Sequence, residues 1–194
     1  MLIVDADVVR AGRQLRAGEL ACPGCGAVLA PWGHGRPREI RGDLGARLLV
    51  RPRRSRCMGC QVTHVLLPEG VWPRRMDAAG VIGAGLEIAA LGMGHRQVAV
   101  RLSLAEGTVR GWIRRFKSRS EEVRRYFTVA LVALADDPVM PGLSGTALAD
   151  AVSAVAAAHR AAATKWSHMH TVSRWEVAGR AISGRVLACS LPAG

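Results

Sequence analysis

The stretches CPGC at residues 22–25 and CMGC at residues 57–60 decide the fold of the N-terminal part of the chain. A C-x-x-C sequence places two thiolates on one tight turn, and two such turns supply the four sulfurs of a tetrahedral zinc site. Glycines in and beside the turns let backbone amides approach the sulfurs. The predicted zinc ligands are Cys22, Cys25, Cys57 and Cys60. Because protein sulfurs fill all four positions, the zinc is expected to be structural and to supply folding free energy.

The chain is strongly basic, with 27 lysines and arginines against 15 acids, a formal net charge of +12 and a pI near 11.2. Eight arginines lie between Arg36 and Arg56, and seven basic residues lie between Arg110 and Arg125. Clustered guanidinium groups favour a polyanionic partner, because each can bind a phosphate or a guanine edge in bidentate fashion. The alternative is a protein of unusual pI without such a partner, since net charge informs about association and not about fold.

The 31 residues between the cysteine pairs exceed the roughly 15 to 20 of the compact zinc pattern, so a β-hairpin is expected within them. The strand candidates are Arg38–Arg41 and Arg47–Arg53. A redox dithiol is the alternative, but it normally uses one pair at a helix start. His34 and His64 are close enough in sequence to replace a ligand, although hydrogen bonding or DNA contact is their expected role. Cys189 has no partner and is expected to be a small apolar side chain.

Neither a signal peptide nor a membrane span is expected. The first ten residues carry Asp5 and Asp7 and lack a basic segment followed by an apolar run. The most apolar stretches, residues 78–93 and 129–135, are interrupted or too short for the about 20 apolar residues of a span. We therefore expect a cytoplasmic, nucleoid-associated protein with no membrane partner. In that reducing compartment, closely spaced cysteines favour a metal site over disulfides.

The pattern becomes helical after residue 73. Asp77 is the predicted N-cap of a first helix, followed by a short helix over residues 96–102 and a turn over 103–105. A third helix begins at Glu106, and its apolar positions follow the i, i+3, i+4, i+7 series of a buried face: Val109, Trp112, Ile113 and Phe116. This order predicts a helix-turn-helix whose second helix enters the major groove of DNA. The alternative is a three-helix core whose arginines are only solvated.

The predicted DNA contacts form two groups. Residues in the first half of the third helix would reach base edges: Glu106, Thr108, Val109 and Arg110. Residues expected to hold backbone phosphates are Arg96, Gln97, Ser103, Arg114, Arg115 and Lys117. Arg110 can pair with guanine, and Thr108 can touch a thymine methyl group or a phosphate. Val109 is also the first residue of the apolar series expected to be buried, so a place in the core is the alternative for this side chain.

Alanine-rich helices are predicted over Val123–Ala135 and Thr146–Ala163, with a last helix from His170 to about Ile182. Such faces suit close helix packing, so they are expected to form a helical cap or a homodimer surface. Trp166 and Trp175 are the expected anchors of this region.

We expect no catalytic site. The acids after residue 126 stand among helix formers and prolines, whereas a transposase core holds separated carboxylates on a sheet around two metal ions. These acids are Asp136, Asp137, Asp150 and Glu176. The sequence shows no phosphate-cradling glycine loop, nucleophile elbow or serine/histidine arrangement. His168 and His170 are the remaining alternative for a metal or catalytic pair, but no third ligand accompanies them.

Several motifs together resemble a known family: residues 22–26, 31–34, 56–60 and 63–68, continued by 94–96 and 107–112. Over about residues 1–120 the chain resembles the actinobacterial zinc-ribbon and helix-turn-helix proteins catalogued as a domain of unknown function. These are similar to the N-terminal halves of insertion-sequence transposases. The resemblance implies DNA binding linked to mobile elements. Residues 117–194 show no counterpart of the catalytic part of a transposase.

These observations predict a mainly α protein with a small β zinc ribbon over residues 1–72, a helix-turn-helix domain over 73–125 and an alanine-rich helical tail over 126–194. The expected function is binding of double-stranded DNA with a structural Zn²⁺, by a transcriptional regulator or mobile-element accessory factor. One alternative is a non-catalytic transposase remnant or partner, with a separate transposase chain supplying catalysis. Another is a protein-interaction adaptor that uses the ribbon and the tail.

Overall fold

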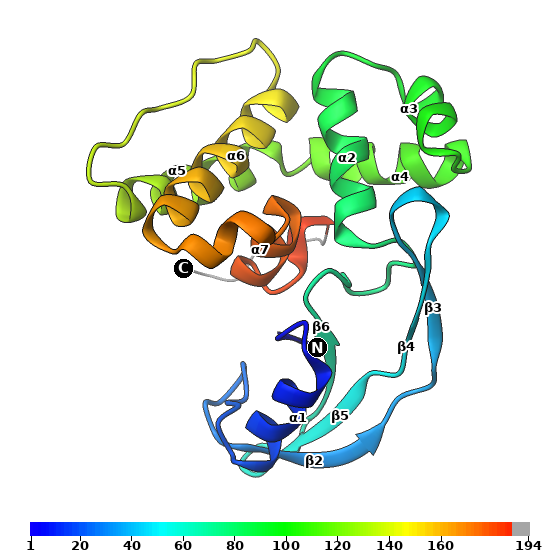
Figure 1. Ribbon diagram of the computed structural model, residues 1–194, viewed down its shortest axis with the longest axis vertical. Helices are drawn as coiled ribbons and strands as arrows, with labels where there is room; N and C mark the ends of the chain where they lie inside the picture. Colours follow the sequence, from blue (N-terminus) through cyan, green and yellow to red (C-terminus); the bar gives the residue numbers. More distant parts are fainter. Residues whose placement is uncertain (188–194) are drawn as a thin grey trace. The chain divides into compact units, whose positions relative to one another are not determined.

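The computed structural model describes residues 1–187 and contains two compact units (Figure 1). The first unit comprises Met1–Ala78, and the second begins at Ala79. The described residues hold seven α-helices, one four-stranded sheet and one two-stranded sheet. The predicted combination of a mainly helical chain with a small β region is therefore confirmed. Cys189, expected to be a small apolar side chain, lies outside the described residues.

The first unit is built on the four-stranded sheet, in the order β1-β6-β5-β2. Its elements are β1 (Leu2–Val4), α1 (Val8–Arg16), β2 (Leu29–His34), β3 (Arg38–Arg41), β4 (Arg47–Val50), β5 (Arg53–Cys57) and β6 (Thr63–Pro68). Strand β1 pairs with β6 in parallel, and the other pairs of this sheet are antiparallel. The sequence predicted only a short element at the N-terminus, because this parallel pair joins opposite ends of the unit.

Helix α1 covers one face of the sheet. It begins after Asp7, whose carboxylate accepts a hydrogen bond from the amide of Val9 at 2.8 Å. Its inner side belongs to an apolar cluster formed by Val4, Ala11, Leu15, Cys22, Leu29, Cys57 and Leu66. Because one cysteine of each C-x-x-C turn is part of this cluster, both turns are fixed to the core that joins α1 to the sheet.

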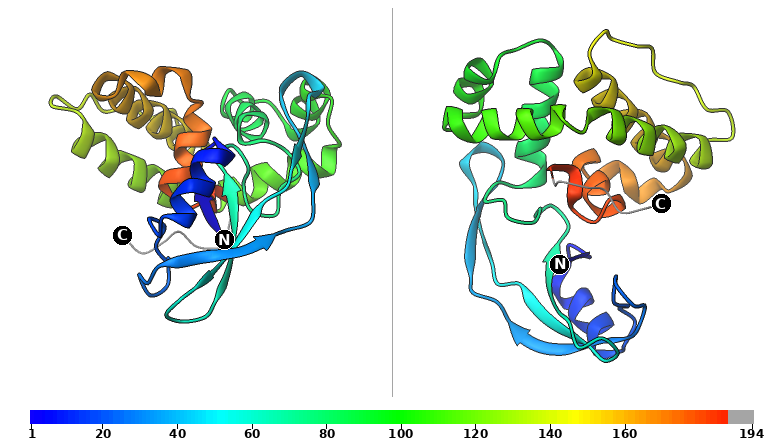
Figure 2. Two further views of the ribbon diagram at one scale, coloured as in Figure 1. Left: turned by 60° about the horizontal axis from the view of Figure 1, so that its bottom comes forward. Right: turned by 180° about the vertical axis from the view of Figure 1, so that it is seen from behind.

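The hairpin predicted between the cysteine pairs is confirmed, since β3 pairs with β4 in antiparallel along the whole of both strands. Strand β4 ends at Val50 and not at Arg53, because Pro52 has no backbone N–H to donate to a ladder. Arg53 instead begins β5 in the four-stranded sheet. The hairpin extends beyond the larger sheet of its unit (Figures 1 and 2).

The turn end of the hairpin is tied to the last residues of the unit. The guanidinium Nε of Arg41 donates to the buried carboxylate of Asp77 at 2.8 Å. The amide of Arg41 donates to the carbonyl of Met76, and the amide of Ala78 donates to the carbonyl of Arg41, both at 2.8 Å. Asp77 is thus held by an ion pair instead of serving as the predicted N-cap, and the helix begins at Ala79.

The second unit is helical within the described residues. Its helices are α2 (Ala79–Ala90), α3 (His95–Leu102), α4 (Glu106–Lys117), α5 (Ser120–Leu134), α6 (Ala147–Lys165) and α7 (Arg174–Ala181). They are seen from behind in the right-hand view of Figure 2. The three-residue turn predicted between α3 and α4 is confirmed, with Ser103 in the left-handed region at φ +54°.

Helix α6 is the centre of the second unit, where α5, α2 and α7 pack against it. Its buried side includes Ala151, Ala154, Ala158 and Ala162. Small side chains let helix axes approach closely, which confirms that the alanine-rich sequence serves helix packing. None of the helices described in residues 1–187 is long and apolar enough to cross a membrane.

The last helix begins later than predicted. His170 lies in a 3-10 turn, and α7 starts after Ser173, which forms a capping box with Glu176. Trp175 is buried, as expected of an anchor. The same expectation is wrong for Trp166, because 41% of its surface is exposed.

The indole of Trp175 lies directly on the backbone of α2. A Cβ atom added at Gly83 would lie 1.9 Å from Cδ1 of Trp175. The indole Nε1 donates to a carboxylate oxygen of Glu87 at 2.7 Å, and Phe116 of α4 meets the ring edge-on at a centroid distance of 6.0 Å. One glycine therefore allows three helices to converge on one tryptophan.

Substitution Gly83→Ala should lower the free energy of unfolding by about 1 to 3 kcal/mol, because the indole or α2 must move to admit a methyl group. Urea unfolding followed by circular dichroism measures this loss. Gly107→Ala is the matched control, since a Cβ at this helical glycine would meet nothing within 4 Å. Its stability should stay equal or rise by up to about 1 kcal/mol. Equal losses in the two variants would contradict the role given to Gly83.

Candidate metal centre and basic surfaces

The two C-x-x-C turns have the same backbone geometry. The amide of Cys22 donates to the carbonyl five residues further on at 2.8 Å, and the amide of Cys57 does the same at 2.9 Å. The residue after the second cysteine is left-handed in both turns, with φ +73° at Gly26 and φ +61° at Gln61. This conformation turns the chain back on itself and brings the two sulfurs of each pair to the same side.

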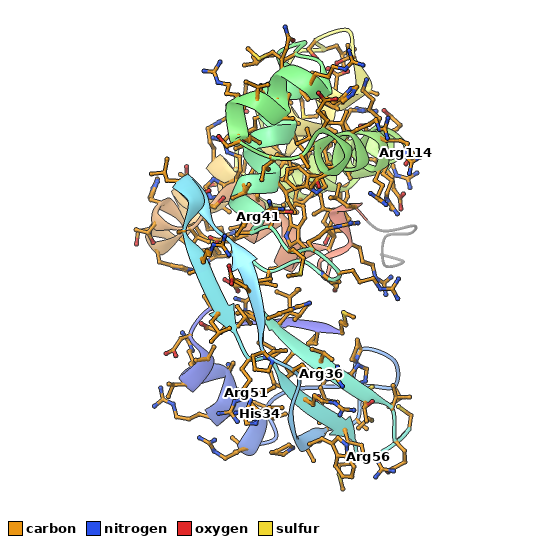
Figure 3. The ribbon with its side chains drawn as sticks, turned by 90° about the vertical axis from the view of Figure 1, so that its right-hand side faces the viewer. His34, Arg36, Arg41, Arg51, Arg56 and Arg114 are labelled. Carbon is orange, nitrogen blue, oxygen red and sulfur yellow. The ribbon has the colours of Figure 1, made fainter. Side chains whose placement is uncertain are left out.

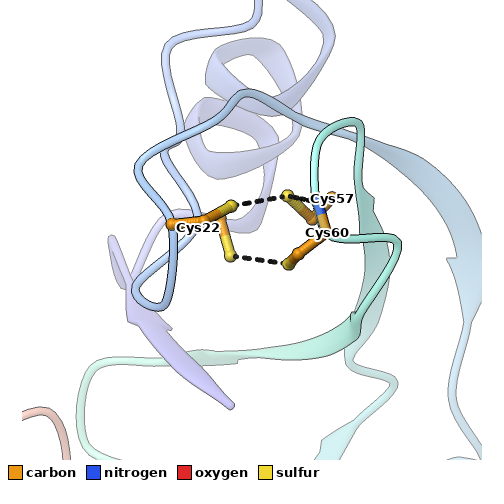
Figure 4. A group of neighbouring side chains, drawn as sticks. Cys22, Cys57 and Cys60 are labelled. Carbon is orange, nitrogen blue, oxygen red and sulfur yellow. Dashed lines mark hydrogen bonds between the residues drawn. The ribbon is translucent and has the colours of Figure 1, made fainter.

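The four sulfurs of the two turns form one cluster (Figure 4). All of them lie within 4.8 Å of one another. The Sγ atoms of Cys22 and Cys60 are 3.8 Å apart, and those of Cys25 and Cys57 are 3.4 Å apart. A tetrahedral ion with metal–sulfur bonds of about 2.3 Å has sulfur–sulfur edges of about 3.8 Å. The cluster is therefore compatible with a tetrahedral metal site.

Gly59 allows the two turns to approach each other. A Cβ at this position would lie 2.8 Å from Cβ of Ala27 and 3.6 Å from Sγ of Cys25. The next amide, that of Cys60, donates to Sγ of Cys57 at 3.4 Å. The predicted need for a glycine beside the sulfurs is thus explained at Gly59 by the close approach of the other turn.

Each turn contributes a buried first cysteine and an exposed second cysteine. The pKa of the Cys25 thiol is lowered, mainly by a hydrogen bond from the backbone of Ala27. The backbone of Val62 acts in the same direction on Cys60, but its neighbouring thiols outweigh it and raise the pKa of Cys60 to about 11. Four thiolates at this separation repel one another, and a cation bound among them removes the repulsion.

His64 lies beside the cluster and His34 does not. His64 is buried on β6, and its Nε2 is 3.4 Å from Sγ of Cys22. Burial lowers the pKa of this imidazole, which favours its neutral form. His34 is exposed at the end of β2. His64 thus has the hydrogen-bonding position expected from sequence, and the four cysteines form the cluster without either histidine.

Strands β2 and β5 and the residues that continue them carry a basic surface. Figure 3 shows His34, Arg36, Arg51 and Arg56 along this part of the first unit. The guanidinium carbon of Arg56 lies 4.8 Å from the centre of the Trp32 indole ring. The sequence interpretation gave Trp32 no role, because the strand pairing that places it beside Arg56 is not visible in a sequence.

Helix α4 separates apolar and basic side chains onto opposite faces. The predicted inner face is confirmed as buried: Val109, Trp112, Ile113 and Phe116. Arg110, Arg114 and Lys117 are exposed. The Val109 side chain has no exposed surface at all, so it belongs to the core and cannot touch a base in this fold. Its prediction as a DNA contact is corrected accordingly.

Three other predicted contacts have partners near the start of α3 and α4. Arg96 and Glu106 form an exposed ion pair, with 3.5 Å between Nε and Oε2. Gln97 uses its side-chain oxygen to accept a hydrogen bond from the amide of Gly94 at 3.1 Å. Arg96 and Glu106 would have to separate before both could contact another molecule, whereas Gln97 serves the start of α3.

The remaining predicted contacts differ in their exposure. Nη1 of Arg115 donates to the carbonyl of Gly111 at 3.0 Å, so this side chain lies along α4 and is half-buried. Ser103 is exposed at the end of α3, and Thr108 is half-buried in the first turn of α4. The side chains that project freely from α4 are therefore a smaller set than predicted.

A groove lies beside the basic face of α4. Arg110, Arg114 and Lys117 line it together with residues at the end of α2 and at the starts of α3 and α6. Helix N-termini carry partial positive charge, and α6 begins at one capped by Thr146. No acidic side chain of the described chain lines the groove. Its three cations and the starts of α3 and α6 suit an anion such as a phosphate group, whereas the end of α2 adds partial negative charge.

His168 and His170 lie in an exposed 3-10 turn of the second unit. Within residues 1–187, the four-cysteine cluster is the one group of three or more metal-ligating side chains that the fold brings together.

If the cluster holds a metal ion, removal of that ion with a chelator should unfold the first unit, because two of the four sulfurs lie in its core. Cys57→Ser should also abolish stoichiometric metal binding. Metal content by mass spectrometry and secondary structure by circular dichroism measure the two effects. Cys189→Ser is the control, since this cysteine stands outside both C-x-x-C turns. Full metal content in Cys57→Ser would rule the cluster out as the site.

Substitution His64→Ala should weaken metal binding by about 10- to 100-fold, the usual effect of removing a hydrogen-bonding partner of a metal ligand. Competition against a chromophoric chelator gives the affinity. His34→Ala removes the exposed histidine of the same unit and should leave the affinity unchanged. The role of His64 is refuted if both variants bind the metal as the unmodified chain does.

Residues 22–112 match the model of a family described as a domain of unknown function (DUF6431). This region includes both cysteine pairs, the turn between α3 and α4 and the first half of α4. Comparison with curated proteins and with solved structures gives no match. The chain is therefore similar to this family over the region that holds the four-cysteine cluster, and the family description names no activity.

Proposed function

We propose that the protein binds double-stranded DNA through α4 and that its four cysteines hold a structural zinc ion. The observation that carries the proposal is the division of α4 into a buried apolar face and an exposed face with Arg110, Arg114 and Lys117. None of these three side chains forms an ion pair within residues 1–187. Unpaired cations clustered on one helix face are the electrostatic feature expected of a duplex-binding helix.

Helices α3 and α4 and the turn between them correspond to a helix-turn-helix, with α4 as the recognition helix. Helix α2 packs against both, which gives the pair the support that such a motif needs. Arg110 would pair with a guanine edge and Thr108 would meet a thymine methyl group or a phosphate. Glu106 would accept from a cytosine amino group once Arg96 turns to a phosphate. Val109 is left out of this set because it is buried.

The groove beside α4 would receive backbone phosphates. Arg114 and Lys117 line it, and the starts of α3 and α6 add their partial positive charges. Ser103 at the end of α3 would add a further phosphate contact, whereas Gln97 and Arg115 would first have to leave their hydrogen bonds with Gly94 and Gly111. These contacts fix the helix on the duplex, whereas Arg110 supplies base selectivity.

Zinc is the metal that the donor set favours. Four thiolates in a tetrahedral arrangement select zinc or an iron–sulfur centre, and a closed site with no open position has a structural role. Because the turns belong to the core beneath α1, a bound ion would stabilise the sheet that carries the basic residues of β2 and β5. The zinc would thus act through folding.

A non-catalytic role, as a transcriptional regulator or an accessory factor of a mobile element, fits the use of the acidic side chains in the second unit. Asp150 accepts hydrogen bonds from Ser144, and Glu176 caps α7. Both carboxylates therefore have structural partners. If the protein assists transposition, a separate transposase chain would supply catalysis, and in either role the protein would be associated with nucleoid DNA.

A homodimer would use α5. The alanines of α6 are already buried within the unit, whereas α5 exposes Val129 and Val132. A two-fold symmetric protein would be expected to bind a palindromic site.

Random-duplex selection with zinc-loaded protein tests the proposal. We expect the selection to enrich one sequence motif. In Arg110→Ala, the preference for one base at one position of that motif should fall by about 1 to 3 kcal/mol. Lys117→Ala should weaken binding to all duplex sequences alike. The salt dependence of the affinity should fall by the equivalent of about one phosphate contact. Arg160→Ala is the charge-matched control, because this exposed arginine lies on α6 away from α4.

Sequence-blind binding that Arg110→Ala does not alter would contradict the specific contact. Absence of duplex binding would contradict the whole proposal and favour a protein-interaction adaptor. That second function is supported by exposed Met58 and Val62 on the second cysteine turn.

A further inference from the structure

Strand register places one tryptophan and two arginines on one face of the sheet. Ser55 and Cys57 of β5 are buried, and Cys57 belongs to the cluster under α1. Because successive side chains in a strand point to opposite faces, Arg54 and Arg56 point away from α1. Arg56 stacks over Trp32, which puts the tryptophan on this outer face as well.

Trp32 is unusually exposed for a tryptophan, with 49% of its surface accessible. It stands on β2, an edge strand of the sheet, so nothing in the sheet covers it from the side of that edge. The contact with Arg56 keeps a guanidinium plane and an indole ring together at the surface. Such a pair offers two flat faces on which another aromatic ring can stack.

The sequence around this pair contains basic residues and no acidic ones. Residues 20–38 and 44–68, which include β2, β5 and β6, contain no aspartate or glutamate. Beyond Trp32, a hydrogen bond from the amide of Gly35 to the carbonyl of Pro52 holds Arg36 and Arg51 on neighbouring segments. Within residues 1–187, Arg36, Arg51 and Arg54 form no ion pair. A negatively charged polymer is therefore the complementary ligand.

The exposed ring of Trp32 favours a single strand over a duplex as the ligand. In double-stranded DNA each base is covered by its neighbours in the stack, so Trp32 would gain only contact with the backbone. In a single strand the bases can turn outward, stack on an aromatic ring and leave their phosphates to flanking arginines. Exposed tryptophan and unpaired arginines on neighbouring strands are the two components of such a surface.

We propose that the outer face of the sheet, with Trp32, Arg54 and Arg56, binds single-stranded DNA, and that Arg36 and Arg51 hold its phosphates. This site is on the first unit and goes beyond the duplex binding proposed for α4. DNA is the chosen polymer because the chain's proposed duplex ligand is DNA, and to that extent the choice rests on the proposed function. The base stacks on the Trp32–Arg56 pair without sequence selectivity.

The test uses the full-length, zinc-loaded protein and a fluorescein-labelled oligothymidylate of about 16 nucleotides, a length within the range of single-strand sites. Fluorescence anisotropy gives the affinity. Trp32→Ala should weaken binding of this strand by about tenfold or more, whereas Trp32→Phe, which keeps an aromatic ring, should retain most of it. Arg56→Lys keeps the charge but loses the planar group, and it should also weaken binding.

Trp166→Ala is the matched control. Trp166 is also an exposed tryptophan beside a cation, since Nζ of Lys165 is 5.9 Å from its ring centre. Its removal should leave binding of oligothymidylate unchanged. Quenching of tryptophan fluorescence by the oligothymidylate should likewise disappear in Trp32→Phe and persist in Trp166→Phe. Circular dichroism and metal content of each variant must match those of the unmodified chain.

A duplex of the same length separates this proposal from the one for α4. Arg110→Ala should weaken binding of the duplex and leave binding of the single strand unchanged. Trp32→Ala should weaken binding of the single strand and leave binding of the duplex unchanged. If Trp32→Ala weakens binding of the duplex and of the single strand equally, Trp32 contacts only the DNA backbone and the proposal is overturned. Unchanged binding of the single strand by Trp32→Ala would also overturn it. Tighter binding of oligouridylate than of oligothymidylate would overturn the choice of DNA. Failure of duplex binding alone would overturn the α4 proposal and leave this site standing.

Discussion

The first unit depends on the meeting of two cysteine turns from distant parts of its sequence. Each turn has its first sulfur in the core beneath α1 and its second sulfur at the surface. The apolar core of this unit is small, so side-chain burial alone provides limited stability to a segment of this size. A metal ion bound by the four sulfurs would join the turn that precedes β2 to the turn between β5 and β6. The outer face of the sheet, with Trp32 and Arg56, is held by the same link.

The second unit depends on packing instead. Alanines on α6 admit close neighbours, and Gly83 gives the Trp175 ring a place against α2. This packing buries the apolar side of α4 from Val109 to Phe116 and leaves its arginines on the opposite side. The basic face is therefore a consequence of the core: the same i, i+3, i+4 positions that bury Trp112 and Ile113 decide where Arg110 and Arg114 point. Exposed cations arranged in this way are available to a phosphate backbone and to base edges.

Under the two proposals, the two units would offer chemically different surfaces to a nucleic acid. Helix α4 presents guanidinium and ammonium groups on a convex helix that suits a groove, with helix N-termini nearby for phosphates. The sheet presents an exposed indole with a stacked guanidinium, which suits a base that has left its duplex. The two proposals assign only part of each arginine cluster to DNA, since Arg41, Arg119 and Arg124 form ion pairs within their own units.

Much of this could be predicted from the sequence, because the signals are local. The spacing of Cys22, Cys25, Cys57 and Cys60 determined the cluster, the period of Val109 to Phe116 determined the inner face of α4, and the turn at residues 103–105 lay where expected.

Only the tertiary structure decided the features that depend on distant partners. Asp77 pairs with Arg41 at the turn end of the hairpin, β1 joins β6 in parallel, His64 meets Cys22, and Trp32 meets Arg56 through strand register. Trp166 and Trp175 look alike in sequence, yet only the one that meets Gly83 is buried. The physical reason is that local pattern fixes which face of an element is apolar, whereas the partner of each polar or aromatic side chain is fixed by packing between elements far apart in the chain.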